Sequence, residues 1–94
     1  MPGAEPLPGR YVAPGLVDAH AHPCVGPGPV ARNHAETLDE LTAWAASGIC
    51  LVRDTGSPGG SALQLDPGPG RPRLQAAGRF LAPAGRYFPA LLPE

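Results

Sequence analysis

The chain has 94 residues, which is enough for one small domain at most. Its formal net charge of -1 gives no electrostatic reason to expect binding to nucleic acid or to an anionic membrane. No run of about 18 apolar residues is present, so no membrane-spanning helix is expected. The absence of a visible secretory signal, together with only two cysteines, predicts a cytoplasmic protein with reduced thiols.

Residues 1–9 contain three prolines and two glycines and predict a disordered lead-in, whereas residues 10–94 predict one α/β unit. Within this unit, 16–22 is expected to form the first strand, because it follows a Pro-Gly turn signal and ends at a proline. The segment 24–32, rich in glycine and proline, is expected to be a loop.

The clearest predicted helix covers residues 34–47. Asn33 is a good N-cap, and Glu36 completes a capping box. Gly48 is placed to end the helix. Residues 49–54 begin with a continuous apolar run, which is typical of a buried parallel strand. A third strand is predicted within residues 74–82, centred on 74–77. This order of elements predicts a βαβ unit.

A row of polar side chains ends the first predicted strand. Because side chains alternate along a strand, Asp18, His20 and His22 are expected to share one face. Two neutral imidazoles at fixed separation are good ligands for zinc, and the carboxyl ends of parallel strands are where such sheets place their sites. The alternative is two partly exposed histidines without a ligand, with Asp18 either supporting a ligand imidazole or held in a polar network.

Three other residues leave alternatives open. Asp54 ends the second predicted strand and either supports the metal site or pairs with Arg53. Cys24 lies near the histidines and is interpreted as a loop thiol rather than a third ligand. Cys50 falls in the apolar run and is expected to lie in the core.

The segment Ala13–His22, which contains the His-Ala-His motif, resembles the first-strand signature of the amidohydrolase superfamily of metal-dependent hydrolases. Ser47–Gly56 and Gln75–Gly85 are similar to the second-strand and third-strand segments of its imidazolonepropionase-like and dipeptidase-like branch. The three matches follow one another in order and cover most of the chain.

This resemblance implies the N-terminal part of a (β/α)₈ barrel, with about three of its eight strands present. It implies that His20 and His22 bind one or two divalent metal ions, with zinc expected, and that Asp18 and Asp54 have supporting roles. The implied reaction is hydrolysis of a carbon–nitrogen bond in a small-molecule substrate by a metal-activated water. The catalytic residues of the family come from later strands, so none is expected within these residues.

The chain contains no lysine, although the family uses a carboxylated lysine as a bridging ligand. The expectation is therefore a fragment that is inactive and poorly stable alone. The alternative is a truncated, non-catalytic remnant or a small association module, and self-association into a homo-oligomer is compatible with either interpretation. A third hypothesis is an independent metal-binding module that uses His20, His22 and Cys24.

Overall fold

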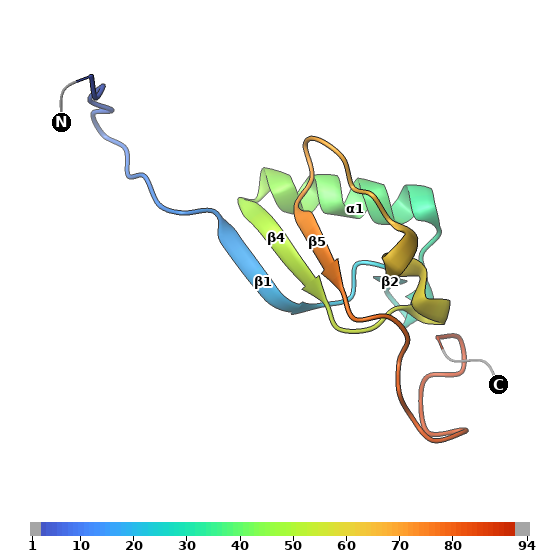
Figure 1. Cartoon of the computed structure of the whole chain (residues 1–94). Coiled ribbons are helices and arrows are strands. Elements are labelled where there is room, and N and C mark those ends of the chain that lie inside the picture. Colours follow the sequence, from blue (N-terminus) through green and yellow to red (C-terminus); the bar gives the residue numbers. More distant parts are fainter. Residues whose placement is uncertain (1–2, 92–94) are drawn as a thin grey trace.

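The computed structural model describes residues 3–91, which contain a three-stranded parallel sheet with a helix across one face (Figure 1). The strands are β1 (Leu16–Ala21), β4 (Ile49–Asp54) and β5 (Arg73–Ala76), and their order in the sheet is β1-β4-β5. Helix α1 (His34–Ala46) connects the first two strands. The chain is therefore a small α/β unit with a βαβ connection, as the pattern of elements predicts.

Two short elements join this frame. Strands β2 (Val25–Gly26) and β3 (Val30–Ala31) pair antiparallel in the segment expected to be a loop, so that expectation is wrong in detail. The turn between them contains Gly28 at φ +80°, a conformation that glycine adopts without strain. A 3₁₀ segment, η1 (Pro58–Gln64), lies between β4 and β5.

Local sequence signals account for helix α1. The Asn33 side chain accepts from the Glu36 N–H at 2.8 Å, and the Asn33 N–H donates to Glu36 Oε1 at 3.0 Å. This reciprocal capping box satisfies two of the donors that every helix N-terminus leaves free. The helix ends at Ala46, and Gly48 follows with φ +98°. The ends agree with the predicted helix to within one residue.

The core lies between helix α1 and the sheet. Leu41 from the helix and Val52 from β4 are both fully buried and pack with Ala21 from β1. The partly buried side chains around them are Trp44, Ile49 and Leu74. Burying a leucine or valine side chain contributes about 1.5–3 kcal/mol, so this cluster supplies much of the cohesion between helix and sheet.

Cys50 departs from the expected core position. The structure leaves it exposed, with its sulfur 3.9 Å from the Gly48 carbonyl oxygen. The helix covers Ile49 and Val52 on either side of it, and the backbone of Gly15 lies beside the cysteine, where any side chain would clash with the sulfur. Position in an apolar run therefore does not bury this residue.

Strand β1 is not a regular two-residue repeat. Asp18 lies opposite Val52 and Ala21 lies opposite Asp54, so β1 carries one more residue than β4 across this interval. Such a bulge changes the direction of the side chains beyond it. Alternation alone therefore does not establish that Asp18, His20 and His22 share one face, and the placement of the histidines follows from the contacts described below.

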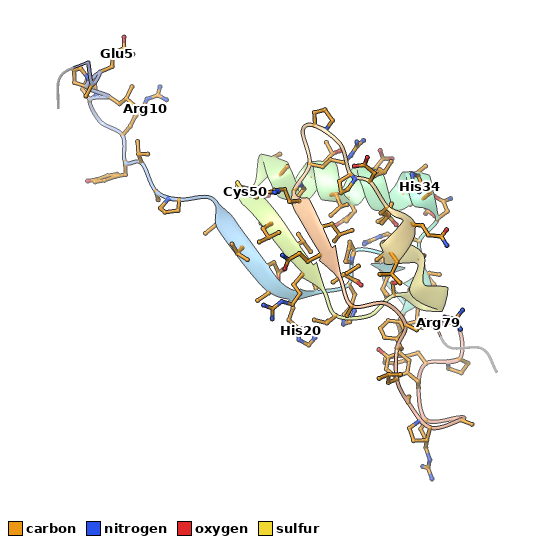
Figure 2. All side chains as sticks on the ribbon, viewed as in Figure 1. Glu5, Arg10, His20, His34, Cys50 and Arg79 are labelled. Carbon is orange, nitrogen blue, oxygen red and sulfur yellow. The ribbon has the colours of Figure 1, made fainter. Side chains whose placement is uncertain are left out.

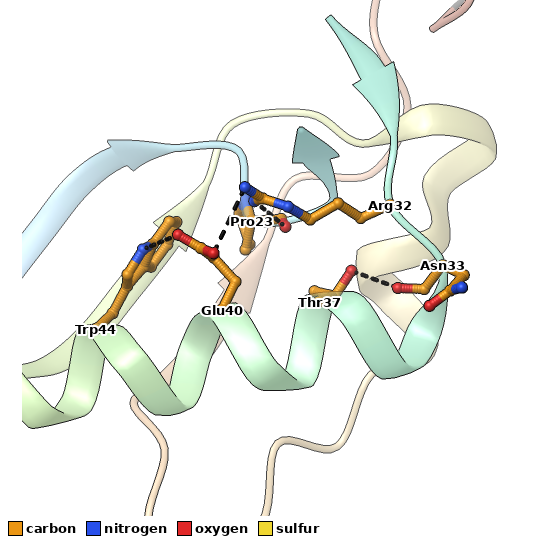
Figure 3. Close-up of polar contacts among 6 residues, drawn as sticks. All are labelled: Pro23, Arg32, Asn33, Thr37, Glu40 and Trp44. Atoms are coloured by element: carbon orange, nitrogen blue, oxygen red, sulfur yellow. Dashed lines mark hydrogen bonds and ion pairs between the residues drawn. The ribbon is translucent and has the colours of Figure 1, made fainter. Parts of the chain in front are cut away.

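A polar network anchors the segment after β1 to helix α1 (Figure 3). Arg32 donates to the Pro23 carbonyl oxygen at 3.1 Å and forms an ion pair with Glu40 at 3.6 Å. Glu40 also accepts from Trp44 Nε1 at 2.8 Å. Because Pro23 directly follows His22, this network fixes the backbone at the end of the histidine motif.

The N-terminal segment runs away from the sheet as an extended arm without regular structure (Figure 1), and Tyr11 in it is fully exposed. Residues 10–13 belong to this arm and form no strand. Residues 1 and 2 of the predicted lead-in lie outside the described residues. Between residues 3 and 91, no helix is both long and apolar enough to cross a membrane.

Candidate metal centre

The two neighbouring histidines lie at the carboxyl end of β1, where the segments after β4 and β5 also arrive. The Thr55 N–H donates to the Ala21 carbonyl oxygen at 3.0 Å, and the Ala77 N–H donates to the Asp54 carbonyl oxygen at 3.0 Å. These bonds continue the parallel ladder past the strand ends. Figure 2 shows His20 and Arg79 at this end of the sheet and Cys50 at the opposite end.

Both ring nitrogens of His22 have a polar group nearby. Nδ1 lies 2.9 Å from the Gly56 carbonyl oxygen. Since a carbonyl oxygen can only accept a hydrogen bond, Nδ1 carries the proton in the neutral ring, and Nε2 has the free lone pair. The Thr55 hydroxyl lies 3.4 Å from Nε2. A backbone carbonyl that fixes the tautomer in this way is a common feature of histidines that bind metal through Nε2.

His20 is exposed and lies edge-on to His22, with 5.4 Å between the ring centroids and 84° between the ring planes. Two imidazoles on one tetrahedral zinc, at about 2.0–2.1 Å from nitrogen to metal, have centroids about 5 Å apart. The observed spacing fits such a pair. Within residues 3–91, however, no group of three or more histidine, cysteine or acidic side chains is arranged to hold a metal. The two histidines therefore have no third such side chain beside them in the described part of the chain.

Asp18 contacts the backbone of His20 rather than an imidazole. Its Oδ1 accepts from the His20 N–H at 3.1 Å. This hydrogen bond lies within the interval where β1 carries its extra residue. The carboxylate therefore stabilises the local backbone conformation that presents His20, and the interpretation of Asp18 as the partner of a ligand imidazole finds no contact here.

Asp54 is fully buried, and neither of its carboxylate oxygens has a hydrogen-bond partner among the described residues. It does not pair with Arg53, whose side chain is exposed. Burial raises the pKa of the Asp54 carboxyl above its ordinary value. The backbone N–H of Gly56, which lies nearby without forming a hydrogen bond to it, and the charge that His22 carries when it is protonated both lower this pKa by less. A buried carboxyl without a partner favours its neutral form.

The pKa of Asp54 predicts a pH dependence of folding. The folded state keeps this proton at pH values where the unfolded chain, with an ordinary pKa of 3.8, has released it. The resulting stabilisation is complete below the unfolded pKa and is lost as the pH rises through the folded pKa. Asp54→Asn is therefore expected to raise the urea midpoint at neutral pH and to flatten its decline with pH. Asp66→Asn, at an exposed position, is the matched control and should change neither; equal profiles for the two variants would contradict the assignment.

An aromatic chain continues from His22. Phe80 lies 5.5 Å from His22 between ring centroids, and Tyr87 lies 4.8 Å from Phe80. Sequence reasoning did not assign these residues to the site, nor did it assign Thr55 and Gly56. No spacing rule links them to the histidines, because the sheet brings together segments more than thirty residues apart. The only signal was an aromatic pair, Tyr87 and Phe88, that needed a surface to pack on.

Cys24 is buried and lines a separate pocket of about 170 Å³ with His34 and Thr37. It is a free thiol, as is Cys50. Because no three-ligand group includes Cys24 in the described part of the chain, the structure does not join it to the histidine pair. Its burial is compatible with the interpretation of Cys24 as a loop thiol rather than a third ligand.

Three curated mycobacterial proteins are similar to this chain: uncharacterized proteins Mb2939c of Mycobacterium bovis and MT2982.1 and Rv2915c of Mycobacterium tuberculosis. Each is 40% identical over 90 residues, which is 92% of this chain and 23% of the relative. The chain thus spans about a quarter of the length of the curated relatives it matches. No protein-family model matches the chain, and no solved structure matches it.

Proposed function

We propose that this chain supplies the first two ligands of the metal centre of an amidohydrolase, an enzyme that hydrolyses a carbon–nitrogen bond in a small molecule. The observation that carries the proposal is His22, whose Nδ1 donates to the Gly56 carbonyl oxygen, so that the unprotonated Nε2 lies beside the ring of His20 and 3.4 Å from the Thr55 hydroxyl. The position of this pair at the carboxyl end of a parallel strand supports the proposal, because barrels and open α/β sheets place their sites there.

The same proposal interprets the sheet as the first part of a (β/α)₈ barrel. The three parallel strands are neighbours in chain order, with α1 between the first two, as in the opening of such a barrel. The resemblance of Ala13–His22 to the amidohydrolase signature supports this interpretation. The curated relatives extend well beyond the matched part, so proteins of their length have room for segments that would complete a barrel and a site.

The residues of this chain have distinct tasks in the proposed site. His20 and His22 would hold a divalent ion, with zinc as the first choice for two imidazoles. A metal bound there lowers the pKa of a coordinated water and polarises the carbonyl that is attacked. Gly56 fixes the tautomer of His22, and Asp18 holds the backbone of His20. The chain alone is expected to be inactive, and two free cysteines support a cytoplasmic location.

Calorimetric titration with zinc tests the proposal. Two ligands make about half of a structural zinc site, so the chain is expected to bind zinc with a Kd on the order of 10–100 μM. His20→Ala and His22→Ala should each weaken binding by at least about tenfold, since a single imidazole remains. His34→Ala, on the exposed first turn of α1, is the matched control and should bind as the wild type does.

Equal affinity in the wild type and the two site variants would refute the proposal. Submicromolar binding that His20→Ala abolishes would instead support the independent metal-binding module, because such affinity requires a further ligand such as Cys24.

A second candidate, a non-catalytic association module or truncated remnant, is favoured by the exposure of β1. Leu16 and Val17 are 61% and 60% exposed, and among the described residues β1 pairs only with β4, which leaves its other edge free. Exposed strand edges favour pairing with another chain. The titration separates the candidates, because an association module would form homo-oligomers without binding zinc through the histidines.

A further inference from the structure

An open, largely apolar groove lies at the amino end of the sheet, opposite the end that carries the histidines (Figure 2). Its volume is about 530 Å³. The residues that line it come from the last turns of α1, the start of β4 and the turn before β5: Thr42, Ala45, Ala46, Ile49, Cys50, Gly70 and Arg71. Because the helix residues here are small, the groove has room for a large side chain of another segment.

The N-terminal arm leaves the sheet at the rim of this groove. The Leu16 N–H donates to the Gly48 carbonyl oxygen at 2.9 Å. The backbone of Gly15 lies against Cys50, which lines the groove, and an added Cβ at Gly15 would meet the cysteine sulfur. The base of the arm is therefore fixed beside the groove, whereas residues 3–13 extend away from the sheet (Figure 1).

The arm carries three large apolar side chains into the solvent. Leu7 and Val12 are 53% and 84% exposed, and Tyr11 is fully exposed. A turn over residues 7–10, with a proline and a glycine at its centre, is closed by the Arg10 N–H, which donates to the Leu7 carbonyl oxygen at 3.2 Å. This turn keeps Leu7 close to the other two residues, so the three form one apolar segment.

The extended arm makes the chain longer than a compact protein of its size. The radius of gyration is 16.8 Å, and the molecule measures 60 × 23 × 22 Å along its principal axes. A compact chain of this length has a radius of gyration of about 12 Å. Covering exposed apolar side chains with another apolar surface lowers the free energy. Because the arm runs away from its own groove, the groove of a second copy is the matching surface that it can reach.

The area that such an exchange buries fits a stable dimer. One tyrosine with a leucine and a valine would bury roughly 300–500 Å² of the arm, and the groove would lose a similar area. In a two-fold dimer each arm enters the groove of the other copy, so the contact is made twice and buries on the order of 1,200–2,000 Å². A single one-way contact would bury about half of this area, which is typical of weak contacts.

We propose that two copies of this chain form a two-fold dimer by exchanging their N-terminal arms. Tyr11 and Val12 of each copy enter the groove beside Ala46 and Cys50 of the other copy. The contact lies at the end of the sheet away from the histidines, so it leaves their site open and does not depend on the proposed function. It also leaves the free edge of β1 unpaired.

Sedimentation equilibrium of the 94-residue chain in a chelator tests the dimer, with an expected Kd on the order of 1–100 μM. Tyr11→Ser removes the main side chain of the arm and should weaken dimerisation at least about tenfold. Ala46→Arg fills the groove and should weaken it equally, while a cation in the last helical turn keeps the fold intact. Controls are Leu81→Ser, at an exposed position far along the chain, and Ala43→Arg, at an exposed helix position outside the groove. Both should dimerise as the wild type does, and circular dichroism should show the same helix content in all variants.

A mixture of the two weakened variants tests the exchange itself. The intact arm of Ala46→Arg can enter the intact groove of Tyr11→Ser, which restores one of the two contacts. The mixture should therefore associate more tightly than either variant alone. A chain that stays monomeric up to about 1 mM would overturn the inference. So would a dimer that neither substitution weakens, as expected for pairing through the edge of β1, or a mixture that associates no better than its components.

Discussion

Gly56→Ala is expected to lower the free energy of unfolding by about 2–5 kcal/mol. Gly56 has φ +146°, a conformation that residues with a side chain rarely adopt, and an added Cβ would lie 2.5 Å from Phe80 Cδ1. The substitution therefore strains the backbone and displaces a buried ring at the same time. Because the Gly56 carbonyl oxygen also accepts from His22 Nδ1, zinc affinity should fall as well. Urea unfolding followed by circular dichroism measures the first effect and calorimetry the second.

A matched control separates strain from steric clash. Gly59 has φ +61° with no atom within 4 Å of an added Cβ, so Gly59→Ala is expected to cost only about 1–2 kcal/mol. Adding Phe80→Ala to Gly56→Ala should cost less than the sum of the two single substitutions, because the clash is removed. If Gly56→Ala destabilises the chain no more than Gly59→Ala does, the packing of Phe80 over Gly56 is not present in solution.

Leu41→Ala is expected to lower the free energy of unfolding by about 2–5 kcal/mol. Leu41 is 0% exposed and is the helix residue that packs directly with Val52 and Ala21. Small domains have only about 5–15 kcal/mol in total, and this chain has a single small core, so the variant should be largely unfolded at room temperature. The measurement is the loss of helical circular dichroism and of dispersed amide signals in NMR.

Leu7→Ala is the control for Leu41→Ala, because Leu7 lies in the extended arm and is 53% exposed. This change should leave the unfolding curve unaltered. A Leu41→Ala variant that unfolds at the same urea concentration as Leu7→Ala would show that the packing of α1 on the sheet does not stabilise the chain.

Helix α1 could be predicted closely because its determinants are local. The capping box of Asn33 and Glu36 and the terminal Gly48 act within a few residues of the helix, and the structure contains all of them. The strand Ile49–Asp54 was equally accessible, since a short apolar run after a helix has few other solutions in an α/β chain.

Other features depend on contacts that no local pattern contains. Cysteine is a residue type that is often buried, but Cys50 is exposed. Its exposure depends on which part of β4 the helix covers. The extra residue of β1 between Asp18 and Ala21 depends on its register with β4. A strict two-residue alternation could not predict that register.

The candidate site was predictable only at its first element. The pair His20 and His22 stands out in the sequence because it follows an apolar strand. Phe80 and Arg79 reach the pocket beside this pair only through the third strand, about sixty residues later. The isolation of the Asp54 carboxylate could not be predicted either, because it depends on what β1 and β5 place on each side of it.

The central claim is that His20 and His22 bind a metal through Nε2, with the Gly56 carbonyl oxygen holding the His22 tautomer. Its most direct test is ¹⁵N NMR of the imidazole nitrogens during a zinc titration. We predict that zinc shifts Nε2 of both rings together, while Nδ1 of His22 stays protonated and His34 is unaffected. Zinc that leaves the nitrogens of His20 and His22 unchanged, or that binds Nδ1 of His22, would contradict the account.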